Sequence, residues 1–268
     1  MPPVSSRLSR NDDSKQVGVM SGGENPGEGR VAKHEESAVA EAEPVRPARG
    51  ERRKRQTREK LMRAAYHLMA ERGVSSVAIN EITEAADVGF GSFYNHFESK
   101  DAIHEAIVDE VLTRFGQALS RIDQQLEDPA EILGSSIRYV ARRARAEPLW
   151  GRFLSRNAFS FHNLGSGMGQ YLLRDLQRGI DSGRFRSHDF LMTLLSVGGA
   201  ATAAISVEVE LGSGHGPAKL IKQFDADTTN IAERVASSVL QTLGLAREEA
   251  DEIARRPLPN MEIDRGFL

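Results

Sequence analysis

The sequence contains no cysteine, and aromatic residues make up only 6% of its 268 residues. Without thiols, disulfide bonds and thiolate zinc sites are excluded, and a reducing compartment is compatible with the composition. No run of about 18 apolar residues is present, so we expect no membrane-spanning segment. The N-terminus also lacks the apolar segment of a secretory signal. Together these absences predict a cytoplasmic protein that has no membrane partner.

The net charge of −3 is unevenly distributed along the chain. Between Val45 and Lys100 there are 11 Lys and Arg against 7 Asp and Glu, a local charge of +4 that leaves −7 for the rest. Most of the basic excess lies in the run RPARGERRKRQTR. Such a run is either a solvated, disordered arm or a patch attracted to phosphate groups.

The hydrophobic pattern predicts an all-α chain. Residues 1–48 are rich in Gly, Glu, Pro and Ser and nearly free of large apolar groups, which predicts a disordered tail. From Gln56 onward, apolar residues recur every three or four positions, and Pro falls between the periodic segments. The brief alternation in AISVEVEL lies in a helical context. The pattern therefore predicts about nine or ten helices and no sheet.

Two short helices joined by a tight turn are predicted near the start of the periodic region. In VSSVAINEITEAADV, Ile79 and Ile82 share one helical face, and Ser76 is the expected N-cap. Asp87 and Gly89 supply a turn before the next short segment, GFGSFYNHF. This arrangement matches the helix-turn-helix plan, in which the second helix enters the major groove of DNA.

The aromatic residues of the second short helix divide into two groups. Phe93 and Phe97 are four residues apart and should share a face that anchors the helix inward. Tyr94 and His96 point elsewhere, and their polar tips suit phosphate oxygens along the groove wall.

Groups on either side of these rings are also suited to DNA. Gly89 and Gly91 permit close approach of the backbone. The long helix that starts near Ser99 offers free N–H groups to a phosphate, and Lys100 would add a charge-assisted contact.

The stretch from Lys54 to Ile103 resembles the DNA-binding domain of TetR-family transcriptional regulators. It includes AAYHLMAERG, INEITEAADV, GSFYNHF and SKD. The resemblance implies that Tyr94, His96 and Lys100 touch the DNA backbone. It also implies a helical ligand-binding and dimerisation region after Lys100.

Three departures from the family pattern are informative. The turn usually read as Ala-Gly-Val-Ser is Ala86-Asp87-Val88-Gly89 here. Val77 falls near the position of a common Thr, so Ser76 would have to supply the phosphate contact. Phe90 stands where a polar or basic residue is frequent, and it either packs on a thymine methyl group or lies exposed.

The basic residues before the first helix complete the predicted DNA-binding set, as an arm that follows the backbone or enters the minor groove. Phosphate neutralisation by these groups predicts a steep loss of affinity with salt. The predicted DNA-contacting residues are Arg52, Arg53, Lys54, Arg55, Ser76, Gly89, Phe90, Gly91, Ser92, Tyr94, Asn95, His96 and Lys100.

The closing helices, near 188–210 and 228–244, combine small and aliphatic residues that suit either a four-helix dimer interface or the subunit's own core. A dimer would place two reading helices about one turn of DNA apart on a palindrome. The predicted interface residues are Ala200, Ala203, Ala204, Val207, Ala236, Val239, Leu240 and Leu243.

The middle of the chain mixes aromatic and polar residues, which either line an apolar pocket or pack in a core. A pocket would take a mainly apolar or aromatic effector, and the ligand would release DNA by shifting the population of subunit arrangements. The long helix from Lys100 is the expected mechanical link. The predicted ligand-binding residues are Tyr139, Arg142, Trp150, Phe153, Asn157, Phe161, His162, Tyr171 and Met192.

An enzyme is disfavoured by the remaining motifs. GSGMGQ and GSGHGP lack a preceding strand and the Lys-Ser/Thr of a phosphate-binding loop, and no pair of the seven histidines has metal-ligand spacing. We therefore expect no cofactor, no metal and no catalytic residues.

The predicted fold is all-α, with an N-terminal three-helix, helix-turn-helix domain and a larger helical ligand-binding and dimerisation domain. The expected boundaries are a tail at 1–48, the DNA-binding domain at 49–99, the larger domain at 100–245, and a short helix with a flexible tail at 246–268. The predicted function is a dimeric repressor that a small ligand releases from a palindromic operator. The alternative is a helical small-molecule binder or architectural DNA-binding protein that regulates nothing.

Overall fold

The residues that the computed structural model describes lie in helices and in the short segments between them. They are residues 49–157, 165, 167–214, 223, 225 and 227–261. The predicted tail at residues 1–48 and the end of the chain after residue 261 lie outside the described residues. Within the described ranges there is no strand, and the predicted all-α fold is confirmed.

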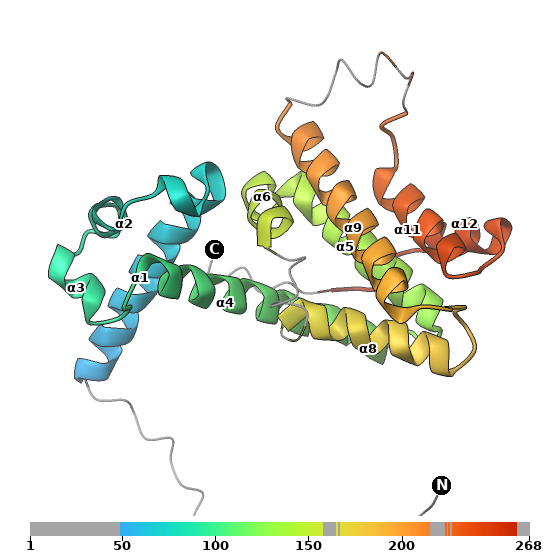
Figure 1. Cartoon of the computed structure of the whole chain (residues 1–268), viewed down its shortest axis with the longest axis horizontal. Helices are drawn as coiled ribbons and strands as arrows, with labels where there is room; N and C mark the ends of the chain where they lie inside the picture. Colours follow the sequence, from blue (N-terminus) through green and yellow to red (C-terminus); the bar gives the residue numbers. More distant parts are fainter. Residues whose placement is uncertain are drawn as a thin grey trace, which may run out of the picture. The chain divides into compact units, whose positions relative to one another are not determined.

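The first elements form the predicted helix-turn-helix region and the long helix that follows it (Figure 1). They are α1 (Arg49–Arg72), the 3₁₀ helix η1 (Val74–Ser76), α2 (Ile79–Ala85), α3 (Phe90–Tyr94) and α4 (Lys100–Ser120). α1 packs against α2 and α4, and α2 packs against α3. The short α3 is therefore supported by a longer framework.

α1 begins at Arg49, earlier than the start near Gln56 that the apolar period indicates. Arg and Lys are good helix formers, and Glu51 in the first turn complements the positive end of the helix dipole. Arg55 Nε also lies 3.6 Å from Glu59 Oε1, one turn later. The basic run is thus part of a helix, and the prediction of an arm was wrong for residues 49–55.

The rest of the described chain adds further helices. They are η2 (Arg121–Gln124), α5 (Pro129–Ala146), α6 (Pro148–Asn157), α8 (Gly167–Asp181), α9 (Phe190–Gly212), α11 (Ile231–Thr242) and α12 (Arg247–Arg255). Ser99 Oγ accepts the Ala102 N–H at 3.0 Å and caps α4, as expected. Pro129 occupies the first turn of α5, and AISVEVEL is helical as the last part of α9.

Two clusters of buried side chains hold these helices together. One joins α1–α4 to α5, α6 and α9, and in it the ring centroids of Phe115 and Trp150 are 4.8 Å apart. The other joins α5, α8, α9, α11 and α12 around residues such as Leu133 and Leu240. α4 packs against α1 and, further along, against α8 (Figure 1), so it connects the helix-turn-helix region to the second part of the chain.

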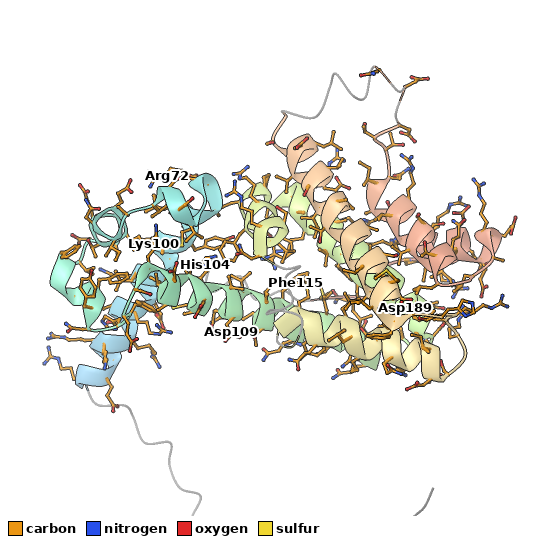
Figure 2. The ribbon with its side chains drawn as sticks, viewed as in Figure 1. Arg72, Lys100, His104, Asp109, Phe115 and Asp189 are labelled. Carbon is orange, nitrogen blue, oxygen red and sulfur yellow. The ribbon has the colours of Figure 1, made fainter. Side chains whose placement is uncertain are left out.

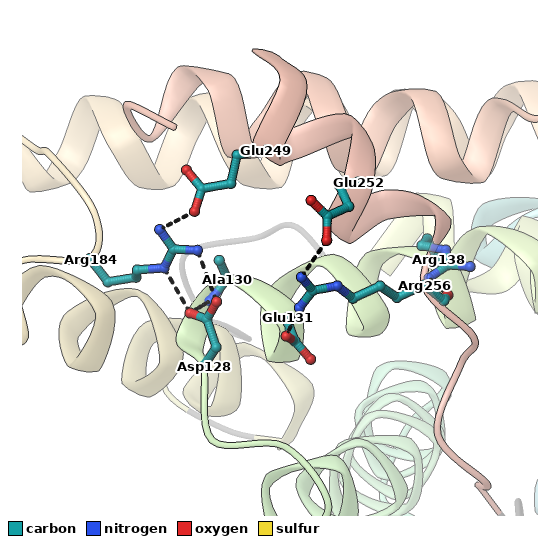
Figure 3. Close-up of polar contacts among 8 residues, drawn as sticks. All are labelled: Asp128, Ala130, Glu131, Arg138, Arg184, Glu249, Glu252 and Arg256. Carbon is teal, nitrogen blue, oxygen red and sulfur yellow. Dashed lines mark hydrogen bonds and ion pairs between the residues drawn. The ribbon is translucent and has the colours of Figure 1, made fainter. Parts of the chain in front are cut away.

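A polar network fastens α12 and the segment after α8 to the start of α5 (Figure 3). Arg184 donates through Nε and Nη2 to the two carboxylate oxygens of Asp128, at 2.8 Å each, and its Nη1 lies 2.8 Å from Glu249 Oε1. Asp128 also caps α5 by accepting the Ala130 N–H at 2.9 Å. Burial alone would raise the pKa of Asp128, but these hydrogen bonds outweigh it and hold the pKa below its ordinary value.

Candidate DNA-binding surface and ligand cavity

The turn between α2 and α3 depends on an aspartate in the left-handed region. Asp87 has φ 53°, and it occupies the position where the family pattern has Gly. Its N–H donates to the Glu84 carbonyl at 3.1 Å, and the Val88 N–H donates to the Thr83 carbonyl at 3.0 Å. Asp tolerates this conformation better than most residues because its short polar side chain forms local hydrogen bonds. The departure in the sequence is therefore compatible with the turn.

The start of α2 differs from the prediction. Ala78 is the N-cap, and its N–H donates to Glu81 Oε2 at 2.8 Å, while Arg72 Nη1 lies 2.8 Å from Glu81 Oε1. These hydrogen bonds, that of Ala78 foremost, lower the pKa of Glu81. Ser76 lies in η1 and is exposed, so its predicted role as the N-cap was wrong. Its predicted phosphate contact remains a prediction.

The rings of α3 and its C-terminal flank point in two directions. Phe93 and Phe97 are buried, with centroids 5.8 Å apart, as their four-residue spacing predicted. Phe90 and Tyr94 are 54% and 52% exposed and meet edge to face at 5.7 Å. The buried pair anchors α3, and the exposed pair forms its outward face.

The glycines before these rings are not required by packing within the described chain. A Cβ at Gly91 would meet no atom within 4 Å, and one at Gly89 would meet only Ser92 Oγ at 3.8 Å. Gly89 has φ −65°, which any residue adopts. Because these glycines have no Cβ, the backbone there is open to an approaching partner.

Lys100 has contacts that the sequence did not predict. Its Nζ donates to the carbonyl of Val77 at 2.9 Å and to that of Ser75 at 3.4 Å, and Figure 2 shows it at the beginning of α4. An ammonium group has three donors, so one is left for a phosphate. Lys100 thus ties α4 to the loop before α2, and its predicted DNA contact remains a prediction.

A basic surface on α1 lies beside the end of α3. Arg58 stacks over the Phe97 ring, 4.4 Å from its centroid. Burial, and then the charges of Lys54 and Arg58, lower the pKa of His96, which favours the neutral ring. The predicted DNA-contacting residues that are exposed are Arg52, Arg53, Lys54, Arg55, Ser76, Gly89, Phe90, Gly91, Tyr94 and Asn95, and Ser92, His96 and Lys100 are half-buried.

A cavity of about 80 Å³ lies among α4, α5, α8 and α9. Its wall is mostly aliphatic, with Leu119, Ile137 and Ile205 among the lining side chains. The side chains on the wall that carry polar groups are Ser136, Tyr171, Asp175 and Thr202. Burial raises the pKa of Asp175 to about 6, although hydrogen bonds from Arg174 oppose the increase. A concave apolar space with a few polar groups is typical of a small-molecule site.

Of the predicted ligand-binding residues, the structure brings Tyr171 to the cavity. Trp150 and Phe153 are buried in the core, the alternative that the sequence left open. Arg142 is exposed and paired with Glu233. Tyr139 packs against the core, Asn157 bonds to His104 at 3.0 Å, Met192 is exposed, and Phe161 and His162 lie outside the described residues.

Asp175 was missed, although the sequence carries a signal for it. Leu172 and Leu176 lie on the face of α8 that packs inward, and Asp175 lies between them on the same face. An acid within a buried stripe indicates a polar group with a specific partner.

The predicted dimer residues divide between the two closing helices. Ala236, Val239, Leu240 and Leu243 are buried in the subunit's own core, so they are not open to a second subunit and this half of the prediction was wrong. On α9, Ala204 is buried, Ala200 and Val207 are half-buried, and Ala203 is exposed. Among the described helices, only α9 is long and apolar enough to cross a membrane, judged by length and composition alone. It packs against α5, α6 and α11.

Among the described residues, no group of three or more His, Asp or Glu side chains is arranged to hold a metal ion.

Two protein-family models match the chain in the regions just described. The model of bacterial regulatory proteins of the tetR family matches residues 61–107. The model of the tetracyclin repressor-like C-terminal domain matches residues 128–256. The first match covers the second half of α1, α2, α3 and the beginning of α4, and the second covers the helices that surround the cavity except α4.

Solved structures of RolR are similar to this chain over most of its length. RolR without ligand is 32% identical, with a TM-score of 0.58, and the match covers 76% of this chain and 100% of RolR. RolR in complex with the ligand resorcinol is 29% identical, with a TM-score of 0.53, and the match covers 79% of this chain and 100% of RolR.

Curated relatives match over the N-terminal region. The HTH-type transcriptional repressor DhaR of Mycobacterium sp. (strain GP1) is 46% identical over 72 residues, 26% of this chain and 34% of DhaR. The HTH-type transcriptional repressor NemR of Escherichia coli (strain K12) is 32% identical over 71 residues, 26% of this chain and 36% of NemR. The chain thus matches about a third of the length of each of these relatives.

Proposed function

Because this chain belongs to the TetR family of transcriptional regulators, we propose that it is a dimeric, sequence-specific DNA-binding repressor. Members of this family bind DNA and act as dimers with small-molecule ligands. In the proposed function, a small, mainly apolar ligand releases the protein from a palindromic operator. The observation that carries the proposal is the outward face of α3, where Phe90 and Tyr94 are exposed although the opposite face is firmly buried.

The arrangement around α3 supports a separation between positioning and reading. Tyr94, His96 and the free donor of Lys100 suit phosphate oxygens, which fix the orientation of the helix without reading sequence. Phe90 and Ser92 lie at the start of α3, which is the end of a recognition helix that meets base edges. An exposed phenyl ring packs well on a thymine methyl group.

An uncovered apolar stripe on α9 supports dimerisation. Leu191, Leu195, Gly199 and Ala203 follow each other at intervals of four residues, and none is buried. A Cβ at Gly199 would meet nothing within 4 Å, so the centre of the stripe is open. Ridges of this spacing pack into the same ridges of a second helix, and small residues allow close approach. We place the dimer face on this stripe instead of on the buried residues of α11.

The dimer face is tested by sedimentation of Ala203→Asp, which puts a charge in the stripe. We expect the protein to become monomeric while its helical circular dichroism is unchanged. Ser182→Asp, at an exposed position after α8, is the matched control and should remain dimeric. A dimeric Ala203→Asp protein would show that the interface lies elsewhere.

The ligand part of the proposal is supported by the cavity and by RolR, whose solved complex contains resorcinol, a small aromatic ligand. α4 lines the cavity through Leu119 and packs against α1 near its other end. A ligand that favours one packing of α4 would therefore change the spacing of the two reading helices, by its differential affinity for the two arrangements.

The alternative is a non-regulatory helical protein that binds a small molecule or acts as an architectural DNA-binding protein. Selection of bound sites from random DNA, followed by footprinting, separates the two functions. We expect a palindromic site to be enriched and protected, and enrichment of no site would favour the alternative. Tyr94→Phe should weaken binding to all sites, Phe90→Ala should change the preferred sequence, and Arg178→Ala on α8 should do neither.

A further inference from the structure

The inner wall of the cavity carries one buried acid. Asp175 on α8 has a side chain that is only 9% exposed, and its neighbours on the wall include Ile137 of α5 and Ile205 of α9. A carboxylate in such surroundings is unfavourable unless its oxygens accept hydrogen bonds.

Internal donors serve only part of this carboxylate. Arg174 donates through Nε at 3.0 Å and Nη2 at 2.7 Å, and both bonds go to Oδ1 of Asp175. The other oxygen, Oδ2, accepts no hydrogen bond from the described residues. The same guanidinium pairs with Asp123 of η2, whose Oδ1 is buried and has no partner among the described residues. Two acids therefore share one Arg, and each has an oxygen to which no described group donates. The oxygen of Asp123 is fully buried, whereas Oδ2 of Asp175 is not fully enclosed.

We infer that this cavity binds a neutral, single-ring aromatic molecule with a hydroxyl group, and that the hydroxyl donates a hydrogen bond to Asp175. The inference deepens the ligand part of the proposed function. The aliphatic wall suits the faces of a ring, and Ser136 and Thr202 offer hydroxyl groups to a further substituent. Asp175 thereby acts as the specificity-determining residue of the site.

The size of the cavity limits the ligand. A dry cavity of about 150 Å³ accepts benzene in a protein core, and the cavity here is about 80 Å³. By this comparison even a single ring requires the aliphatic wall to move outward and enlarge the space. A long acyl chain or a fused-ring molecule does not fit without rearrangement of the helices.

The charge of the cavity limits the ligand further. Asp123, Asp175 and Arg174 together carry one excess negative charge when both acids are ionised, so an anionic ring is repelled. A cationic amine is the competing ligand class, because it would also satisfy a carboxylate. Arg174 already supplies a positive charge to both acids, which favours a neutral donor over a second cation.

Titration calorimetry of the full chain, without DNA, tests the inference with four single-ring probes. Phenol is expected to bind, and anisole, which has a similar ring but no donor, should bind at least about ten-fold more weakly because the hydrogen bond to a charged acceptor is missing. Benzoate and benzylamine should bind more weakly than phenol. Equal affinities for phenol and anisole, or tighter binding of benzylamine, would overturn the inference.

Variants locate the hydrogen bond. Asp175→Asn should weaken phenol binding about ten-fold and leave anisole binding unchanged. Asp181→Asn, at an exposed position on the same helix, is the matched control and should bind phenol like the natural chain. Ala201→Leu, which fills the cavity, should abolish binding of both rings. Unchanged phenol affinity in Asp175→Asn would contradict the assignment.

The outcomes separate this inference from the proposed function. If the chain protects a palindrome but binds phenol and anisole equally, the phenol inference is wrong and the regulatory function stands. If the chain binds phenol through Asp175 but protects no DNA, the cavity assignment stands and the regulatory function is wrong.

Discussion

Arg156 of α6 donates a hydrogen bond from Nη1 to the backbone carbonyl of Ala70, at 2.9 Å, near the end of α1. The last carbonyls of a helix have no partner within it, and a cation there also complements the helix dipole. The same nitrogen lies 3.3 Å from the carbonyl of Met69. α6 is in turn anchored by Trp150 against Phe115 of α4. Arg156 therefore fastens the helix-turn-helix region to the second part of the chain.

We expect Arg156→Met, which keeps the aliphatic stem, to lower the free energy of unfolding by about 1 kcal/mol, because a charge-assisted hydrogen bond at a partly exposed site is lost. Amide exchange should accelerate at the C-terminal end of α1. Arg178→Met on α8 is the control, since that side chain is exposed. If both variants show the same exchange at residues 69–73, the Arg156 contact is not significant in solution.

The sequence alone predicted the structure correctly at positions where a single local rule determines it. The four-residue spacing of Phe93 and Phe97 predicted which rings are buried, and Ser99 predicted the start of α4. These features depend on helical geometry and capping, which involve only neighbouring residues. The helix-turn-helix region was predictable because several such rules coincide within a short stretch.

Features set by distant parts of the chain were not predictable. Trp150 and Leu240 suit a ligand pocket or a dimer face as well as a core, and only the packing of α6 and α11 decides between these roles. The position of Asp175 can be understood only together with Asp123 of η2, because both acids pair with Arg174. Such relationships arise from tertiary contacts that periodicity does not encode.

Gly91→Ala separates folding from DNA binding. The added Cβ meets no atom within 4 Å, and replacing a helical Gly with Ala stabilises a helix by up to about 1 kcal/mol. We therefore expect unchanged or slightly higher thermal stability. DNA affinity should fall at least about ten-fold because the backbone can no longer approach the groove closely.

The measurement is a fluorescence anisotropy titration with a selected DNA site. Gly50→Ala is the control, because it also adds a Cβ in open space on a helix but lies outside α2 and α3. Full DNA affinity in Gly91→Ala would mean that α3 does not approach DNA through this edge.

The left-handed conformation of Asp87 leads to a paired prediction for the turn. Asp87→Val puts a β-branched residue at φ 53° and should lower the free energy of unfolding by about 1–2 kcal/mol. Gly adopts this conformation easily, so Asp87→Gly should change the free energy of unfolding by less than about 1 kcal/mol. Relief of strain offsets the greater freedom of the unfolded chain. Chemical denaturation measures both, and equal losses in the two variants would rule out backbone strain as the cause.

The Asp128–Arg184 pair predicts an acid-sensitive contribution to stability. Asn is a good N-cap, so Asp128→Asn removes the charge and keeps the cap of α5. The pKa of Asp128 is below its ordinary value in the folded chain, so its contribution is fully present above the ordinary pKa and is lost as the pH falls through the lowered one. We expect a loss of about 1–2 kcal/mol at pH 7 that shrinks toward pH 3. A loss that does not change with pH would exclude the ion pair as its source.

Asp175 predicts the opposite dependence on pH. Its pKa is raised to about 6 by burial, so the folded chain binds the proton more tightly than the unfolded chain. Asp175 therefore lowers stability as the pH rises from the ordinary aspartate pKa through 6, and the full cost applies above that range. Asp175→Asn removes this cost while Arg174 keeps its pair with Asp123. In the absence of ligand, we expect this variant to be more stable by about 2 kcal/mol at pH 8 and no more stable at pH 4. Urea unfolding of Asp175→Asn and Asp128→Asn across this pH range measures how each variant's change in unfolding free energy depends on pH, and the two slopes should have opposite signs. If Asp175→Asn is less stable than the natural chain at pH 8, the acid serves the fold instead of a ligand.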